Sequence, residues 1–190
     1  AFTSRKVEGL DLTDPLKVIV PSKGLNFVQK IIGQNEESLS VAVTDNNILF
    51  RTENGVIMAR LIEGHYPNYS DVIPKGLPNA IELSKKDFSS AIRKAALTTN
   101  EESKAVRFAF SGNKLTLSSR APELGEAKVE LDVEYNGPDQ AIGFDPKFML
   151  AGMKVLESDA ARLEFGDSES AGILREGKEF LYVVMPISMP

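Results

Sequence analysis

The sequence predicts an α+β fold of antiparallel sheets with helices on one face, and three observations support it. Short runs of alternating or β-branched residues recur about every 8–12 residues between turn-forming segments. Only three segments show helical periodicity. The residues expected to begin them, Ser22, Ser84 and Asp145, lie 62 and 61 residues apart, so the chain is repetitive. A repeat that covers a small sheet with one helix is an α+β unit.

Eleven runs alternate in polarity or are rich in branched residues, and we expect each to be a strand. They are residues 18–20, 39–43, 47–52, 56–62, 80–83, 106–110, 114–118, 127–135, 140–144, 161–165 and 180–187. With the helices, they give three copies of the order strand, helix and three or four strands, written βαβββ. The segment 61–79, rich in proline and turn formers, is the expected connector between two blocks.

The expected helices have recognisable ends. The first has Ser22 as its N-cap and stops at Gly33. The second has Ser84 as its N-cap, and the third has Asp145 as its N-cap followed by Pro146. Each carries an apolar stripe that predicts the face packed on a sheet. The stripes are Leu25, Val28 and Ile32 in the first helix, Phe88, Ala91, Ile92, Ala95 and Ala96 in the second, and Met149, Gly152, Met153 and Leu156 in the third.

Composition excludes several classes of protein. The chain has 190 residues, 42% of them hydrophobic, which is enough to bury a core. It has no cysteine, which excludes disulfides, zinc–thiolate sites, iron–sulfur clusters and thiol catalysis. No apolar run approaches the roughly 20 residues of a membrane span, and residues 1–15 lack the apolar core of a signal peptide. We therefore expect a cytoplasmic protein that does not associate with membranes.

Positive charge is concentrated on the three expected helices. Each carries two cations seven residues apart, a spacing that puts both on one face. Segments 22–32, 85–97 and 146–156 hold eight basic residues and one acidic residue, although the whole chain has a formal net charge of −5. The eight cations are Lys23, Lys30, Lys85, Lys86, Arg93, Lys94, Lys147 and Lys154.

Two interpretations of these cations are open. Lysines on the exposed face of a single helix usually serve only solvation. Three helices that repeat the pattern in an otherwise acidic protein favour a basic face that contacts phosphates. Because no aromatic or base-reading side chains accompany the cations, such a face would bind nucleic acid without sequence preference and with strong salt dependence.

No catalytic constellation is evident, so we expect no enzyme activity, no cofactor and no metal. The acidic pairs at 36–37 and 101–102 are adjacent in sequence, so their side chains would diverge. Segments 45–47 and 167–169 contain oxygen ligands for a hard cation, but Asp and Asn are equally expected at hairpin turns. The single histidine, His65, lies in the expected connector, where a structural role is the simpler interpretation.

Several segments resemble one family. They are VIVPSKGL at 18–25, ARLIEGHYPNYSDVIPK at 59–75, VRFAFSGNKLTLSSRAPELGEA at 106–127, IGFDPKFML at 142–150 and LYVVMPI at 181–187. In this order and spacing they are similar to the bacterial sliding clamp family, the beta subunit of DNA polymerase III. The resemblance covers nearly the whole chain.

The resemblance implies a DNA-clamp fold and a ring that encircles duplex DNA. Such rings contain six similar domains, each of two βαβββ repeats, so that twelve helices line the hole. This chain has three repeats. By the resemblance, residues 1–76 are the second half of a middle domain plus the connector, and residues 77–190 are a complete last domain. The helix cations would then face double-stranded DNA.

The resemblance also assigns two interaction surfaces. A peptide-binding cleft that receives linear motifs of DNA polymerase and clamp-loader subunits would comprise Pro67, Val72, Phe148, Val183, Val184, Met185, Pro186, Ile187 and Met189. A ring interface for self-association would comprise Leu97, Thr98, Glu123, Glu126 and Glu130, whose acidic residues would pair with cations of a neighbouring domain. The expected function is a DNA sliding clamp without catalytic activity. The alternative is a peptide-binding module that does not close on DNA.

Overall fold

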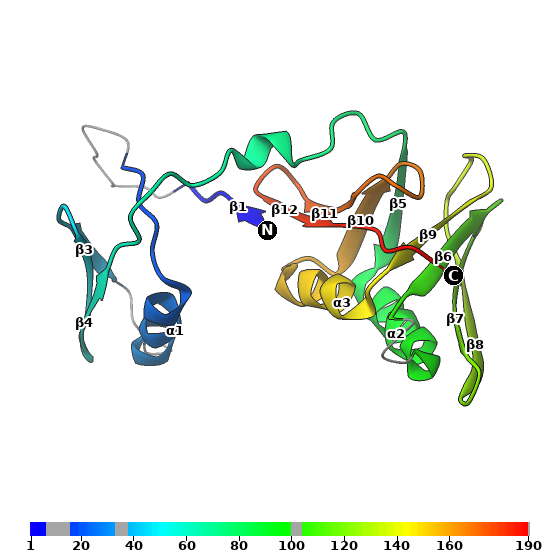
Figure 1. Ribbon diagram of the computed structural model, residues 1–190, viewed down its shortest axis with the longest axis horizontal. Coiled ribbons are helices and arrows are strands. Elements are labelled where there is room, and N and C mark those ends of the chain that lie inside the picture. The colour runs from blue at the N-terminus through cyan, green and yellow to red at the C-terminus, as the bar shows by residue number, and fades with distance from the viewer. Residues whose placement is uncertain (7–15, 33–37, 100–103, 190) are drawn as a thin grey trace. The chain divides into compact units, whose positions relative to one another are not determined.

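The computed structural model describes residues 1–6, 16–32, 38–99 and 104–189. The chain divides into two compact units. The small unit is Glu8–Tyr69, and the large unit is Ala1–Val7 together with Ser70–Pro190. Figure 1 labels most elements of both. The division falls at 69/70, within the expected connector.

The small unit is one helix on a three-stranded antiparallel sheet. Helix α1 (Ser22–Ile31) lies on β4 (Gly55–Arg60), which pairs with β3 (Asn47–Thr52), which in turn pairs with β2 (Ser40–Val43). Its buried apolar core consists of Val28, Ile48 and Phe50. Gly24 makes the close approach possible, because a Cβ there would lie 3.0 Å from the Ala59 Cβ.

The large unit contains two complete βαβββ repeats. The first is β5 (Asn79–Ser84), α2 (Lys85–Ala95), β6 (Val106–Ser111), β7 (Lys114–Ala121) and β8 (Gly125–Asp132). The second is β9 (Gln140–Phe144), α3 (Pro146–Val155), β10 (Ala160–Phe165), β11 (Gly172–Glu176) and β12 (Phe180–Val184). The short strand β1 (Phe2–Thr3) pairs with β12. One-turn 3₁₀ helices occupy Tyr69–Asp71 and Ala96–Thr98.

The two repeats of the large unit exchange their first strands. Strand β5 of the first repeat pairs with β10 of the second, and β9 of the second pairs with β6 of the first. The resulting sheets have the orders β1-β12-β11-β10-β5 and β8-β7-β6-β9, and all their pairs are antiparallel. Each repeat is therefore complete only in the presence of the other.

Helices α2 and α3 lie side by side and bury their apolar stripes in one core shared by both sheets (Figure 1). The core is rich in aromatic side chains. Phe110 and Phe165, one from each sheet, stack with ring centroids 4.0 Å apart, and Phe108 meets Phe144 edge to face at 5.3 Å. Burying each such ring contributes about 1.5–3 kcal/mol relative to leaving it exposed. The aromatic contacts join the two sheets into one unit.

The helix starts expected at Ser84 and Asp145 are confirmed. Ser84 Oγ accepts from the Asp87 N–H at 3.3 Å, and Asp145 Oδ1 accepts from the Lys147 N–H at 2.8 Å. The expectation for Ser22 is wrong. The N-cap of α1 is Pro21, whose carbonyl accepts from the Gly24 N–H, and Ser22 is the first helical residue without a side-chain cap. Proline is compatible with this position, because its fixed φ, here −60°, matches the backbone of the residue that precedes the helix and because the N-cap N–H is not needed for a helical hydrogen bond.

The apolar stripes of α2 and α3 are confirmed, but that of α1 is not. Within α2, the stripe residues are buried except Ala96, which is partly buried and follows the helix. In α1 only Val28 of the predicted stripe is buried, whereas Leu25 and Ile32 are 44% and 41% exposed. A single small sheet does not extend far enough to cover both flanks of the helix.

Three strand predictions differ from the structure, at residues 18–20, at β11 and at the end of β12. Residues 18–20 form no ladder within the described residues, although the Ile62 N–H donates to the Ile19 carbonyl at 2.9 Å. Strand β11 was not predicted, because the turn-forming segments 166–170 and 175–179 left only four residues between them. The last predicted strand ends at Val184 rather than 187. Gly33 and the acidic pairs at 36–37 and 101–102 lie outside the described residues.

Candidate functional site

A basic groove runs between the two helices of the large unit. It has a volume of about 490 Å³ and is lined by Lys85, Ser89, Arg93, Lys147, Leu150, Ala151, Met153 and Lys154. Four of the eight lining residues are cations. Arg93, Lys147 and Lys154 are exposed, and within the described residues no ion pair or hydrogen bond of their side chains is recorded. Their charges are available to an anionic ligand.

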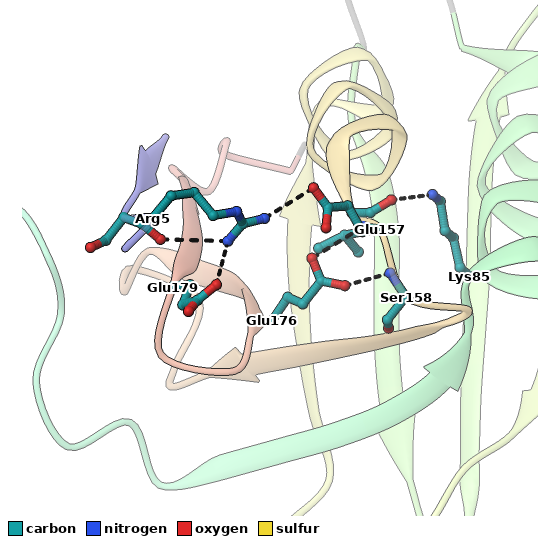
Figure 2. A network of polar contacts seen from close by, with 8 residues as sticks. Arg5, Lys85, Glu157, Ser158, Glu176 and Glu179 are labelled. Carbon is teal, nitrogen blue, oxygen red and sulfur yellow. Dashed lines mark hydrogen bonds and ion pairs between the residues drawn. The ribbon is translucent and has the colours of Figure 1, made fainter. Parts of the chain in front are cut away.

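Lys85 has a different role from its three neighbours. Its Nζ donates a hydrogen bond to the Leu156 carbonyl, the residue at the C-terminal end of α3 (Figure 2). A cation is stabilised at this position by the partial negative charge of the helix terminus. Lys85 therefore links the start of α2 to the end of α3 and holds the two walls of the groove together.

The structure brings together four of the eight predicted DNA-facing cations. Lys86 and Lys94 are exposed on α2 but do not line the groove. Lys23 and Lys30 are exposed on α1 in the small unit, where the Lys30 ammonium lies 5.6 Å from the centre of the Phe27 ring. Sequence spacing favoured Lys86 as the partner of Arg93, whereas the groove is lined by Lys85.

Five acidic residues of the large unit form ion pairs with cations outside the helices, namely Glu82, Glu130, Glu157, Glu164 and Glu179. Among the described residues, every recorded ion pair uses one of Arg5, Arg60, Lys114, Lys128, Arg162 and Arg175. Arg162, for example, bonds both Glu82 and Glu164 at 3.1 Å. These carboxylates are thus neutralised by cations outside the helices, whereas no helix cation forms an ion pair within the described residues.

A polar network supports the turn that follows α3 (Figure 2). Arg5 forms ion pairs with Glu157 at 3.0 Å and Glu179 at 2.7 Å. The Glu176 carboxylate accepts from the backbone N–H of Glu157 at 3.1 Å and from that of Ser158, and the Glu157 N–H in particular lowers the pKa of Glu176. Sequence reasoning missed this network because its members look like ordinary charged turn residues.

The predicted cleft residues differ in accessibility. Phe148 on α3, Met185 and Val72 are exposed, and Val183, Pro186, Ile187 and Met189 are partly buried. Val184 is only 3% exposed and packs in the core, so it presents no surface to a ligand and its prediction is corrected. Pro67 is exposed in the small unit. Apolar surface of the large unit thus surrounds the end of β12 and one face of α3.

Two glycines position this surface. The Ile187 N–H donates to the Gly143 carbonyl at 2.9 Å, and a Cβ at Gly143 would lie 2.7 Å from Met189 Cγ. A Cβ at Gly152 would lie 2.7 Å from the Tyr182 ring. The C-terminal tail therefore follows β9, and α3 packs closely on β12, because both glycines lack a side chain.

The predicted ring-interface residues lie around an edge strand. Leu97, Glu123 and Glu126 are exposed, and Thr98 donates to the Ser119 carbonyl at 3.1 Å. Strand β8 is an edge of its sheet. Within the chain, Glu130 already pairs with Lys128 and Lys114 at 2.8 and 3.2 Å, and its pairing with a cation of a neighbouring domain stays a prediction. The Lys128 hydrogen bond in particular lowers the pKa of Glu130.

The remaining constellations give no further site among the described residues. Hydrogen bonds from the Ser170 side chain and from the backbone N–H groups of Glu169 and Ser170 lower the pKa of Asp167, which is a turn former here. In the described part of the chain no group of three His, Asp or Glu residues could hold a metal ion. No described helix is long and apolar enough to cross a membrane.

Two family models match the chain consecutively. The first describes the C-terminal domain of the DNA polymerase III beta subunit and matches residues 70–188. The second describes the central domain of the same protein and matches residues 4–68. The junction coincides with the division between the two compact units.

Individual proteins support the same assignment. The beta sliding clamp of Staphylococcus epidermidis is 30% identical over 187 residues, which is 96% of this chain and 50% of that protein. That of Staphylococcus aureus is 30% identical over 173 residues, covering 90% and 46%. The chain therefore spans about half the length of the curated relatives it matches.

Solved structures agree with the α+β clamp fold. The sliding clamp of Pseudomonas aeruginosa bound to griselimycin superposes with a TM-score of 0.87 at 27% identity, over 95% of this chain and 50% of that one. The sliding clamp of Bacillus subtilis superposes with a TM-score of 0.85 at 27% identity, over 91% and 47%.

Proposed function

Because this chain belongs to the DNA polymerase III beta subunit family, we propose that it acts as part of a DNA sliding clamp. In this role it contacts duplex DNA without reading its sequence, associates with further copies of itself and docks replication proteins. It catalyses no reaction, needs no cofactor and works in the cytoplasm, where bacterial DNA is replicated. Its helices supply the DNA contacts.

The observation that carries this proposal is the basic groove. Arg93, Lys147 and Lys154 converge from two helices, and the described residues offer them no recorded acidic partner. The chain as a whole has a net charge of −5, so a basic face here is not a consequence of overall charge. Cations that neutralise phosphates release counterions from DNA, which gives affinity that is independent of sequence and sensitive to salt.

The test is the salt dependence of duplex binding. The variant Arg93→Ala/Lys147→Ala/Lys154→Ala removes the three unpaired groove cations and spares Lys85, which has a structural hydrogen bond. A matched control is Arg107→Ala/Lys75→Ala/Lys178→Ala, which removes the same charge from exposed positions outside the helices. A plot of log K for DNA binding against log salt has a negative slope, and each lost phosphate contact reduces the magnitude of that slope by about 0.9.

We expect the magnitude of the slope to fall by about 2–3 in the groove variant and to change little in the control. If both variants change the slope equally, only net charge matters and the groove has no special role. The comparison can be made by fluorescence anisotropy on a labelled duplex at several salt concentrations.

A second activity, docking of linear peptide motifs from polymerase and clamp-loader subunits, is favoured by the exposure of Phe148 and Met185 in the large unit, whose other described aromatic rings are buried or partly buried. Exposed aromatic and methionine side chains are typical of adaptable peptide grooves. Griselimycin, found with a similar clamp, is a suitable probe. Phe148→Ala and Met185→Ala should each weaken its binding roughly tenfold, whereas Met58→Ala, equally exposed in the small unit, should not.

Retention on DNA separates the clamp from the alternative of a peptide-binding module that does not close on DNA. A clamp stays on nicked circular DNA during gel filtration and is lost once the circle is cut. A module that only docks peptides elutes apart from DNA in both cases. Self-association is required for closure, since the described part of the chain contributes only three α-helices, and the edge at Leu97 and β8 is one surface available for it.

A further inference from the structure

A second groove of the large unit lies beside the free edge of β5. It has a volume of about 860 Å³ and is lined on one side by residues 80–82 of that strand and on the other by residues 132–134, where β8 ends. Asn113 and Arg162 complete the lining. This groove shares no residue with the basic groove between the helices, the predicted peptide cleft or the predicted ring interface. It is therefore a separate surface.

Strand β5 presents free backbone hydrogen-bonding groups to this groove. The strand pairs with β10 on one side and is an edge of its sheet on the other. The Lys85 N–H donates to the Asp159 carbonyl, and hydrogen-bonded pairs recur at every second residue of an antiparallel ladder. The odd-numbered residues of β5 therefore bond to β10, whereas the N–H and C=O groups of Ala80 and Glu82 point toward the groove. Among the described residues no backbone hydrogen bond to these groups is recorded.

The second repeat shows what lies beside the corresponding strand. Strand β9 begins that repeat as β5 begins the first, and the Ile187 N–H donates to the Gly143 carbonyl of β9 at 2.9 Å. Gly143 lies two residues before the N-cap of α3, and Glu82 lies two residues before the N-cap of α2. At the place that corresponds to the groove, the chain's own residues after β12 thus occupy the free edge of β9.

In the first repeat, the corresponding segment does not follow β5. The Val133 N–H donates to the Asn113 carbonyl at 3.0 Å, so this residue continues the ladder with β7 instead. Residues 133–139 then lead to β9. A Cβ at Gly137 would lie 2.6 Å from Asn79 Oδ1, which shows that this segment approaches β5 at its first residue. The middle of the β5 edge is left without a strand partner in the described part of the chain.

The charges of the groove favour a basic occupant. Asp132 and Glu134 are exposed, and among the described residues their carboxylates have no recorded ion pair. Lys114 stands opposite Asp132 in the ladder, but its ammonium pairs with Glu130. Arg162 is already bonded to two glutamates. Two carboxylates beside the free edge are therefore available to cations from another molecule.

We propose that the β5 edge binds an extended segment of a partner protein that carries basic side chains at alternate positions. The main chain of this segment pairs with Ala80 and Glu82 in the antiparallel direction used throughout the sheet, as an added strand does at an exposed edge. This interaction goes beyond the proposed clamp function. Its test uses neither DNA nor griselimycin, so its failure leaves that function intact.

The alternation follows from the two faces of the groove. The side chains of Glu82, Asp132 and Glu134 are exposed, whereas Ile81 and Val133 are only 2% and 6% exposed. Successive side chains of a strand point to opposite faces of its sheet. Basic side chains on the outer face of the added strand therefore meet the carboxylates, and small side chains on its inner face lie over the core.

The probe is a short fluorescein-labelled peptide that alternates lysine with threonine, a residue that favours strands. Fluorescence anisotropy at low ionic strength measures its affinity, and amide exchange followed by NMR locates it. The N–H groups of Ala80 and Glu82 should exchange about tenfold more slowly at saturating peptide. The Ile81 N–H, already bonded to β10, should change little. No detectable binding, or binding without slower exchange at Ala80 and Glu82, would overturn the proposal.

Charge variants test the acidic side of the groove. Asp132→Asn/Glu134→Gln keeps the size of both side chains and removes their charge, and it should weaken peptide binding about fivefold or more. The matched control Asp159→Asn/Glu169→Gln removes the same charge from exposed positions of the large unit outside the groove, and it should change binding little. Equal weakening by the two variants would show only attraction to a protein of net charge −5 and would contradict the proposed site.

Backbone methylation of the peptide tests strand pairing without any change to the protein. Opposite residues of an antiparallel pair exchange hydrogen bonds and have their side chains on the same face. The lysines lie on the outer face, like Glu82, so their backbone N–H groups donate to β5. Methylation of the lysine backbone nitrogens should weaken binding about tenfold, and methylation of the threonine backbone nitrogens should not. A peptide with methylated lysine backbone nitrogens that binds as tightly as its parent would contradict the pairing.

Discussion

The small and large units are built from the same repeat but differ in how much of it is buried. The large unit buries two helices between two sheets, with phenylalanines from both repeats in contact. The small unit buries Val28, Ile48 and Phe50 and leaves the flanking apolar side chains of α1 exposed. The comparison teaches that one βαβββ repeat specifies its own helix and hairpins, whereas stable burial requires a second repeat.

The physical reason lies in the strand exchange. Each repeat of the large unit lends its first strand to the other, which makes the two sheets and the core interdependent. A unit of about 60 residues buries a smaller fraction of its surface than a larger one, and its stability is correspondingly marginal. We therefore expect the two units to unfold separately, the small one first.

Truncation of a core side chain should have the largest effect, and it should lower the stability of only the unit that contains that side chain. Phe108→Ala removes a fully buried ring from the large unit and should lower its unfolding free energy by about 3–5 kcal/mol. Phe50→Ala should abolish the structure of the small unit in dilute solution and leave the large-unit transition unchanged. Urea unfolding followed by circular dichroism and limited proteolysis distinguishes these effects, and a single shared transition in both variants would show that the units are not independent.

Removal of helix caps should have a smaller, graded effect. Ser84→Ala and Asp145→Ala each remove a side-chain hydrogen bond at a helix start and should cost about 0.5–2 kcal/mol. Ser22→Ala should cost little, because Ser22 makes no cap bond. The urea midpoint of each unit measures the difference. A destabilisation by Ser22→Ala as large as that by Ser84→Ala would contradict the observed caps.

The smallest expected effect is on acid stability. The pKa of Glu176 is lowered in the folded state, chiefly by the Glu157 N–H, so its ionised form favours folding. Its contribution is complete above the ordinary value of 4.5 and is lost as pH falls through the lowered pKa. Glu176→Gln should therefore make the large unit less stable at pH 7 and flatten its loss of stability below pH 4.5. Thermal melts at a series of pH values test this, and an unchanged slope would remove Glu176 from the account.

Local signals predicted the features that depend on neighbours in sequence. The caps at Ser84 and Asp145 and the buried stripes of α2 and α3 follow from hydrogen-bonding side chains and helical spacing. The strand at 18–20 was predicted from branched residues alone, yet a strand exists only where another strand pairs with it. Leu25 and Ile32 were expected to be buried for the same local reason, and burial depends on what covers them.

The candidate site was predicted in part. Helical spacing found the cations, but it paired Arg93 with Lys86, whereas Lys85 lines the groove beside Arg93. Val184 could not be recognised as a core residue without knowing which face of β12 the helices cover. Glu130 pairs with Lys114 across a hairpin and with Lys128 two residues away on the same strand face, contacts that depend on the observed strand register.

Amide hydrogen exchange in rising urea tests most directly whether the two units unfold separately. The account predicts that protection of α1 and β3 in the small unit is lost at lower urea than protection of α2 and α3 in the large unit. Loss of protection in both units at the same urea concentration would contradict it.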